Sequence, residues 1–257
     1  MGVRDDLNIT PELLTATDSC SVDDVIQLPK LRSRLSKEVD SASRWHEIVK
    51  QQTQELINDI AKYSDLEKLK RELEHVKQSI TSNISTGELR MHKQAQSLKF
   101  KNLELSNWYI DDNLKVWLNH EARGHMASDL RRYVYASSYA KAYGISPKGH
   151  EGFYLEGLRP NHKNWESGKF SDRFRVQVGS KPATTITSHI SKDGHYFIHP
   201  DASQCRSFSV REAARIQTFP DNYFFLGTRT QQFTQVGNAV PPLLANKIAE
   251  IVKLLLK

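Results

Sequence analysis

Two phrases in the last fifth of the chain constrain its fold more than any other feature. The first is RSFSVREAARIQTFPD at residues 206–221, and the second is QVGNAVPP at residues 235–242. Each combines helix signals with turn residues over a long stretch, so neither is a short pattern of the kind that arises by chance.

Local chemistry predicts how these phrases fold. Ser209 followed three residues later by Glu212 is a capping box, which predicts that a helix begins after Ser209. Gly237–Asn238 predicts a tight turn whose backbone can approach a ligand closely. Pro241–Pro242 predicts the start of a strongly apolar last helix.

Together the two phrases resemble the last two ordered motifs, IX and X, of DNA (cytosine-5) methyltransferases. The resemblance implies that motif IX forms a helix that braces a target-recognition domain against a catalytic domain. It also implies that motif X lies beside the first strand of a Rossmann-like sheet and completes a pocket for S-adenosylmethionine (AdoMet). The residues implied to line the methionine end of AdoMet are Asn238, Ala239 and Val240.

The resemblance further implies that the last helix packs against the catalytic sheet. An isolated chain would therefore expose an apolar patch around Leu243, Leu244, Ile248 and Ile251.

The catalytic motifs of the resembled family are absent from this sequence. In that family a cysteine of a Pro-Cys-Gln turn adds to C6 of a flipped-out cytosine, and a glutamate of Glu-Asn-Val stabilises the protonated ring. The two cysteines here, Cys20 and Cys205, do not follow a proline, and there is no Glu-Asn pair or glycine cluster after an apolar run. We therefore expect no catalytic residue in this chain and a partner chain that supplies these groups and most of the AdoMet pocket.

Charge is distributed unevenly along the chain. Residues 93–181 hold 15 Lys or Arg and 9 Asp or Glu, a balance of +6 that equals the net charge of the whole sequence. Aromatic residues are interleaved among these cations, a combination typical of a surface that faces phosphates. We therefore expect duplex DNA as a partner, although a solvated lysine-rich surface is equally compatible with the charge alone.

Composition excludes several other classes of protein. The two cysteines lie far apart without metal-ligand spacing, which argues against a disulfide scaffold or a zinc site, and a reducing cytoplasm is the simplest setting. No apolar stretch is long enough to cross a membrane, and the N-terminus lacks a signal-peptide core. We expect a cytoplasmic chain with one large or two small domains and no membrane partner.

Residues 41–83 carry apolar side chains at helical spacing in two runs, and the second run steps by three and four as a coiled-coil seam does. Ser64 and Glu67 form another capping box in the sequence, which predicts the start of the second helix. We predict an antiparallel hairpin that packs on its own domain, with an arm that docks a partner as the alternative.

His120, Glu121 and His125 invite comparison with the zinc-protease motif. That motif places its second histidine four residues after the first on the same helix face, whereas Gly124 occupies that position here. We expect no metal site, and we expect both histidines to be surface or hydrogen-bonding residues, with contact to phosphate as the alternative.

Residues 151–205 alternate apolar and polar side chains in short runs. Residues 174–178 predict a strand, and a turn at Asp193–Gly194 between two strand-like runs predicts a hairpin. This stretch resembles the end of the family's target-recognition domain, where a Thr followed by an aliphatic residue recurs. Thr185–Ile186 is the best match, and Thr187 gives an alternative register. The candidates for DNA contact are Thr185, Ile186, Arg206, Arg173, Arg175 and Lys163, with Arg159 and Lys169 beside them.

The three arginines of the first phrase allow two roles each. Arg211 and Arg215 lie within the predicted helix, where buried ion pairs are favoured over contacts with phosphate. Arg206 lies just outside that helix, and contact with the DNA backbone is as compatible with this position as a buried pair.

We predict an α+β chain in which a small mixed β target-recognition domain carries a helical hairpin. A C-terminal helix would pack on a partner's Rossmann-like AdoMet-dependent methyltransferase domain. Residues 15–34 resemble the stretch that follows motif VIII, which indicates that the chain begins near the junction of the family's two halves. The predicted divisions are a junction at 1–40, the hairpin at 41–92, target recognition at 93–205, and motifs IX and X at 206–257.

The resemblance implies the DNA-recognition part of a restriction-modification enzyme that moves a methyl group from AdoMet to C5 of cytosine in duplex DNA, inactive without its partner chain. An inactive remnant of a single-chain enzyme and a stand-alone DNA-binding module are the alternatives. A subunit needs the second chain for activity, whereas a binding module binds DNA tightly alone.

Overall fold

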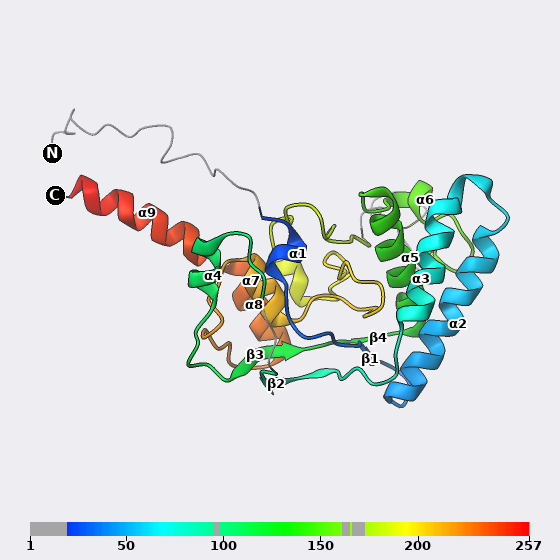
Figure 1. Cartoon of the computed structure of the whole chain (residues 1–257), viewed down its shortest axis with the longest axis horizontal. Helices are drawn as coiled ribbons and strands as arrows, with labels where there is room; N and C mark the ends of the chain where they lie inside the picture. Colours follow the sequence, from blue (N-terminus) through cyan, green and yellow to red (C-terminus); the bar gives the residue numbers. More distant parts are fainter. Residues whose placement is uncertain (1–19, 95–97, 161–164, 166–172, 257) are drawn as a thin grey trace.

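The computed structural model describes residues 20–94, 98–160, 165 and 173–256 as a mixed α+β fold (Figure 1). The α-helices are α1 Val22–Val25, α2 Ala42–Ile60, α3 Glu67–Ser79, α4 Leu103–Tyr109, α5 Ala127–Tyr143, α6 Gly149–Gly152, α7 Val210–Ile216, α8 Arg229–Asn238 and α9 Pro242–Leu255. The strands are β1 Arg34–Leu35, β2 Gly87–His92, β3 Val116–Glu121 and β4 Gly124–His125, and the 3-10 turns are η2 Ser64–Leu66 and η3 Ser188–Ser191.

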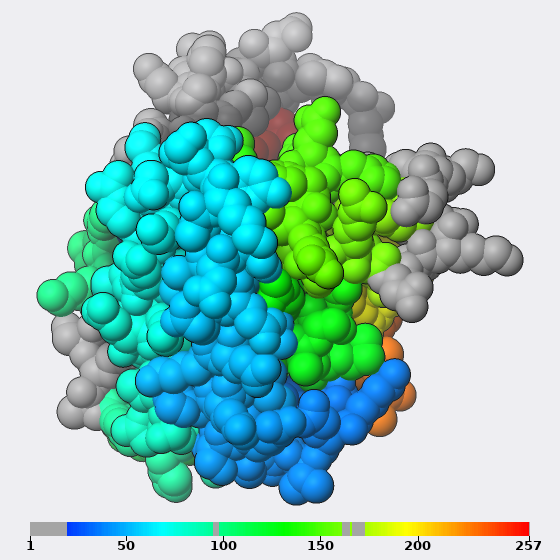
Figure 2. All heavy atoms as spheres, turned by 90° about the vertical axis from the view of Figure 1, so that its right-hand side faces the viewer, coloured from blue at the N-terminus to red at the C-terminus, as the bar shows by residue number. Residues whose placement is uncertain are grey.

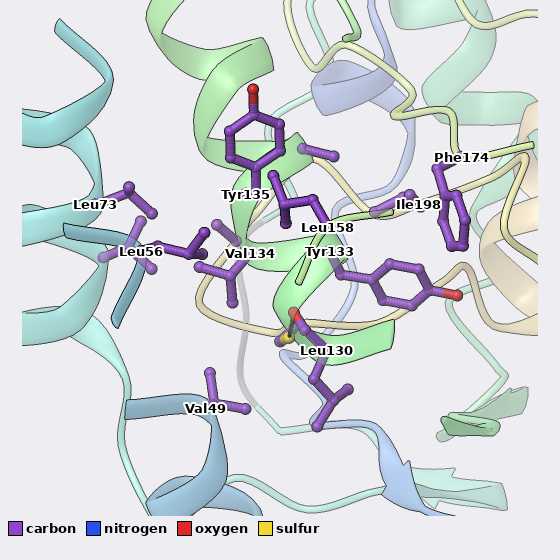
Figure 3. Close-up of a cluster of buried hydrophobic side chains, with 14 of the residues drawn as sticks. Val49, Leu56, Leu73, Leu130, Tyr133, Val134, Tyr135, Leu158, Phe174 and Ile198 are labelled. Atoms are coloured by element: carbon purple, nitrogen blue, oxygen red, sulfur yellow. Dashed lines mark hydrogen bonds between the residues drawn. The ribbon is translucent and has the colours of Figure 1, made fainter. Parts of the chain in front are cut away.

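The predicted helical hairpin is present as α2 and α3, and both helices pack against α5 (Figures 1 and 2). The apolar rows of the hairpin, including Leu56 and Leu73, face Val134 and Tyr135 of α5 (Figure 3). The hairpin therefore packs on its own domain, and this core crosses the expected division between residues 92 and 93.

The expected capping box at Ser64 and Glu67 is wrong. Residues Ser64–Leu66 form a 3-10 turn, and Glu67 is the first residue of α3, which has no side-chain cap. Because the chain tightens into this turn before the α-helix begins, the Ser64 side chain is too early to cap α3.

A second core holds the two C-terminal phrases. Helices α1, α7 and α8 surround it together with the turn η3. The buried aromatic residues Phe208, Phe219, Phe225 and Phe233 fill its centre. Strand β3 lies against α7, so the first phrase is held between a sheet and a helix.

The sheets are small and differ from the prediction. Strands β2 and β3 pair antiparallel, while β1 and β4 form a short parallel pair. The predicted hairpin around Asp193–Gly194 is wrong: Val176 and Ser207 each form only an isolated bridge to Ile198. Residues 188–191 instead form η3, and Ile190 is buried in the second core, so apolar alternation here reflects packing of turns.

Helix α9 extends away from the rest of the fold (Figure 1). None of its residues is buried, and Leu244 and Ile248 are about half exposed, at 52% and 50%. The expected exposure of an apolar last helix is therefore confirmed. Among the described residues, no helix is long and apolar enough to span a membrane.

Candidate DNA-recognition site

Helix α7, formed by the first C-terminal phrase, begins as predicted. Ser209 accepts a hydrogen bond from the backbone N–H of Glu212, and the Glu212 carboxylate accepts one from the backbone N–H of Ser209 at 2.7 Å. Buried His120 supports this cap, because its Nδ1 lies 2.9 Å from the Ser209 hydroxyl. Its Nε2 lies 2.9 Å from the Pro29 carbonyl oxygen, which can only accept. Nε2 of neutral His120 therefore donates, and Nδ1 accepts from Ser209.

Arg206 lies inside the molecule, with 1% of its surface exposed. Its guanidinium contacts both carboxylate oxygens of Glu212 at 2.6 and 2.7 Å and donates to the Leu31 carbonyl at 3.1 Å. It also donates to the Gln204 side chain at 2.6 Å. This burial corrects the expectation that Arg206 contacts the DNA backbone, because its donors already have partners within the fold.

Arg211 and Arg215, the two arginines within α7, are also buried, as the sequence favoured. Arg215 forms a bidentate pair with Asp221, with distances of 2.9 and 2.6 Å, and donates to the Val25 carbonyl at 3.1 Å. Arg211 donates to the carbonyl oxygens of Leu118, Pro220 and Tyr223. Helix α7 is thus tied by charged side chains to α1, β3 and the loop after α7.

Gln217 connects three segments that sequence reasoning did not join. Its Nε2 donates to the carbonyl oxygens of Ile186, Val236 and Ala239 at 3.3, 3.2 and 3.4 Å. One side chain thereby holds the Thr185–Ile186 pair beside the second phrase. The residue belongs to the first phrase, but only the fold identifies its partners.

The expected tight turn at Gly237–Asn238 is wrong, because both residues end helix α8. The glycine serves close packing instead. A Cβ built on Gly237 would lie 2.7 Å from the Thr187 carbonyl carbon and oxygen and 2.8 Å from the Ser188 Cα. Only glycine lets α8 approach η3 this closely.

The three residues predicted to line the AdoMet pocket come directly after Gly237 in the chain. Asn238 is exposed at the end of α8, Ala239 is half-buried against the second core, and Val240 is 63% exposed. Pro242 then begins α9, as predicted. The polar Asn238 and apolar Val240 therefore lie at the surface beside the uncovered α9.

The predicted DNA-contact pair is divided between surface and core. Thr185 is exposed, whereas the Ile186 side chain is 1% exposed and packs in the second core. Ile186 therefore anchors the segment, and its neighbour Thr185 presents a hydroxyl to solvent. This corrects the expectation of a contact through the Ile186 side chain.

The remaining basic candidates for DNA contact have different surroundings. Arg173 pairs with Asp193 at 3.0 Å, and Arg175 lies 5.9 Å from the ring centre of Tyr196. Arg159 is exposed, and its carbonyl oxygen accepts a hydrogen bond from Arg132. Lys163 and Lys169 lie outside the described residues.

His125 is buried and hydrogen-bonded rather than at the surface, so the hydrogen-bonding interpretation of both histidines is confirmed. Tyr133 joins His125 to His195, because its hydroxyl lies 3.2 and 2.6 Å from their Nδ1 atoms. Asp129 completes a group whose potential metal-ligand atoms lie within 4.8 Å of one another. However, Asp129 already binds Arg132 at 3.0 Å, and His125 Nε2 lies 3.1 Å from the Ser207 hydroxyl. These contacts explain the group as an internal hydrogen-bond network.

Burial of His120 predicts a loss of stability in mild acid. Burial lowers its pKa from 6.5 to about 4, so the folded chain keeps it neutral while the unfolded chain takes up a proton below pH 6.5. Stability that is full above pH 6.5 is therefore lost as the pH falls towards 4, by about 2 kcal/mol at pH 5 from this residue. Urea denaturation at pH 7.5 and 5 measures the loss.

The matched variant is His120→Gln, whose amide can still donate to the Pro29 carbonyl. It should be less stable than the wild type at pH 7.5 but lose less stability on acidification. The variant should still lose some stability in acid, because it keeps His125 and His195, whose pKa values burial also lowers. An unchanged pH dependence in His120→Gln would contradict this assignment.

The comparisons with known proteins agree with these motifs. The family model for C-5 cytosine-specific DNA methylase matches residues 29–253. Type II methyltransferase M.Bpa9945I of Bacillus paralicheniformis is 51% identical over 135 residues, which are 52% of this chain and 29% of that protein. Type II methyltransferase M.AgeI of Thalassovita gelatinovora is 44% identical over 88 residues, 34% of this chain and 20% of the relative.

A third relative is matched over much more of its own length. Type II methyltransferase M.AquIB of Picosynechococcus is 40% identical over 94 residues, 32% of this chain and 64% of that protein. For the first two relatives, the match spans less than a third of their length.

The class of protein follows from three findings: the capped helix α7 with its buried arginines, the second phrase, and the family match. This chain belongs to the C-5 cytosine-specific DNA methyltransferase family. Members of this family use AdoMet as the methyl donor and DNA as the substrate.

Proposed function

We propose that this chain is the target-recognition and closing part of a DNA cytosine-5 methyltransferase. A partner chain would supply the cysteine nucleophile, the catalytic glutamate and most of the AdoMet pocket. The observation that carries this proposal is α9, which follows the second phrase directly and has no buried residue. An apolar helix with this exposure is typical of an element that is completed by another surface.

The residues of this chain would have distinct roles in that assembly. AdoMet, when bound, would supply the methyl group for C5 of a flipped-out cytosine. Asn238, Ala239 and Val240 would close one side of its pocket, which fits the exposure of Asn238 and Val240 beside α9. Thr185 and Arg175 would face the duplex, while Gln217 holds the Thr185–Ile186 segment beside the second phrase.

The direct test is to purify the tagged chain natively from its source cells and to measure transfer of labelled methyl groups from AdoMet to duplex DNA. A stoichiometric companion with a Pro-Cys-Gln turn and a glycine-rich loop, together with activity, would support the proposal. Activity of the recombinant chain alone would contradict the need for a partner, and an inactive preparation without such a companion would contradict the catalytic role.

Substitutions in α9 sharpen this test. Leu244→Asp combined with Ile248→Asp should abolish recovery of the companion, because both side chains belong to the exposed apolar face. Asn246→Asp combined with Lys253→Gln makes the same change of charge on the same exposed helix outside that face and is the matched control. Equal recovery with both variants would exclude α9 as the docking element.

Asn238→Ala is expected to weaken AdoMet binding by the assembled enzyme and to leave DNA binding nearly intact. Asn238 is exposed, and no side-chain hydrogen bond involves it within the described part of the chain, so its removal should not disturb the fold. Equilibrium binding of AdoMet and of a labelled duplex separates the two effects. Unchanged AdoMet affinity would remove the cofactor role from this residue.

A further inference from the structure

Three buried arginines of the basic middle of the chain serve the fold. Among the arginines of residues 93–181, Arg131 binds Glu55 and Asp59, and Arg132 binds Asp129. Arg123 is buried over the ring of Phe233. The positive balance of this stretch therefore overstates the charge available to a ligand, and the cations that remain at the surface become more informative.

Three of those remaining cations converge on one hollow of about 540 Å³. Lys148, at the start of α6, lies on one wall, and Arg175 and Lys181 come from the segment that runs towards Thr184. Among the described residues that line it, Glu151 is the one carboxylate, which leaves them a net charge of about +2. Within the described residues, none of the three cations forms an ion pair, and Lys148 and Lys181 are exposed.

Two other hollows of the described structure are acidic, and a third, lined by Lys50, Lys77 and Glu74, carries a smaller positive charge of about +1. The hollow between α3 and α5 is lined by Asp23, Glu72 and Asp201, which offset Lys30 and Lys141. The hollow beside Arg131 is lined by Glu55, Asp59 and Glu156 and is acidic. A phosphate backbone would therefore be attracted to the first hollow and not to these two.

The walls of the basic hollow are fixed by the backbone. The Arg175 N–H donates to the His195 carbonyl at 2.8 Å, and the Ile198 N–H donates to the Arg175 carbonyl at 3.0 Å. The Lys181 carbonyl accepts from the Val22 N–H at 2.9 Å, which ties this wall to α1. The Ser146 hydroxyl accepts from the Val176 N–H at 3.0 Å and joins the two walls. Long cationic side chains are thus presented from anchored positions.

We propose that the basic hollow lined by Lys148, Arg175 and Lys181 is a groove that contacts the backbone phosphates of duplex DNA. The inference rests on the proposed function and adds Lys148 and Lys181 to its DNA-contacting residues. Thr184 lines the groove, and the exposed Thr185 follows it, so the groove adjoins the segment expected to face the duplex. Phosphate contacts here would set the register of the duplex without reading its sequence.

The test is binding of a labelled duplex to the full chain across a series of KCl concentrations. Replacement of all three cations by glutamine should weaken binding and reduce the slope of log Kobs against log [KCl] by about 0.9 for each phosphate that is no longer neutralised. The weakening should be similar for duplexes of different sequence. At matched ionic strength, a mononucleotide should not displace the duplex, and displacement would indicate a nucleotide site instead.

The matched control replaces Lys50, Lys68 and Lys77 of the α2–α3 hairpin (Figure 2) and removes the same charge. It should leave the slope unchanged, and circular dichroism checks that both triple variants fold. If the wild type binds and the groove variant has the same affinity and slope, the phosphate-contacting role of the groove is contradicted. The DNA-recognition role of the chain would then remain supported. A wild-type chain that binds no duplex at low salt, either alone or together with its companion, would overturn both.

Discussion

Replacement of Glu212 by alanine is expected to lower the free energy of unfolding by about 3–5 kcal/mol, because it leaves a buried arginine without its counter-ion. The Glu212 carboxylate accepts two hydrogen bonds from Arg206 and one from the Ser209 N–H, and it is 1% exposed. Burial alone raises the pKa of Glu212, but Arg206 and His199 hold it well below its usual range. The carboxylate is therefore charged at neutral pH, and its loss removes both an ion pair and a helix cap.

Urea denaturation followed by circular dichroism measures this effect. Glu74→Ala removes an exposed carboxylate from α3 and should change stability by less than about 0.5 kcal/mol. A second variant, Arg206→Met with Glu212→Leu, removes both charges and should recover part of the loss, since an apolar pair avoids an uncompensated buried charge. If Glu212→Ala were as stable as Glu74→Ala, the ion pair would not brace α7.

The features that could be predicted from the sequence are those with local causes. The cap of α7 needs only Ser209 and Glu212, and the start of α9 needs only the ring of Pro242. The α2–α3 hairpin follows from helical periodicity, since its apolar rows face the core that Figure 3 shows. In each case the determining residues lie within a few turns of one another, so no tertiary information is needed.

The features that were missed depend on partners far along the chain. Arg206 could have a phosphate or a carboxylate as its partner, and only the fold shows that Glu212 and the Leu31 carbonyl occupy its donors. The alternation around Ile198 predicts a hairpin, but the neighbours that would form a ladder belong to turns. The groove likewise joins Lys148 to Lys181, whose proximity no spacing rule predicts.

Gly237 shows how a residue can be recognised correctly and explained wrongly. A glycine before Asn238 suggests a turn, yet its backbone is helical and it does not adopt a positive φ. Glycine is required at this position because the backbone of Thr187 and Ser188, at the start of η3, leaves no room for a Cβ atom. Sequence preferences describe conformation, whereas this constraint is one of space between two segments.

Gly237→Ala is therefore expected to destabilise the fold by about 1–3 kcal/mol, as overpacking does in a well-packed interior. The new methyl group would meet backbone atoms at 2.7 and 2.8 Å, which cannot move as a flexible side chain can. Relief requires α8 to move away from η3, which would shift Asn238–Val240 and strain the Gln217 hydrogen bonds. AdoMet binding by the assembled enzyme should therefore weaken together with stability.

Gly124→Ala is the matched control for this substitution. A Cβ at Gly124 would lie no closer than 3.5 Å to its nearest neighbour, and its φ is not positive, so the change should be nearly neutral. Urea denaturation of both variants, with AdoMet affinity measured on the assembled enzyme, separates a packing defect from a general intolerance of alanine. If the Gly237→Ala chain were as stable as the Gly124→Ala chain, η3 would be able to move away from the new methyl group without loss of stability. The close approach would then not explain why glycine occupies this position.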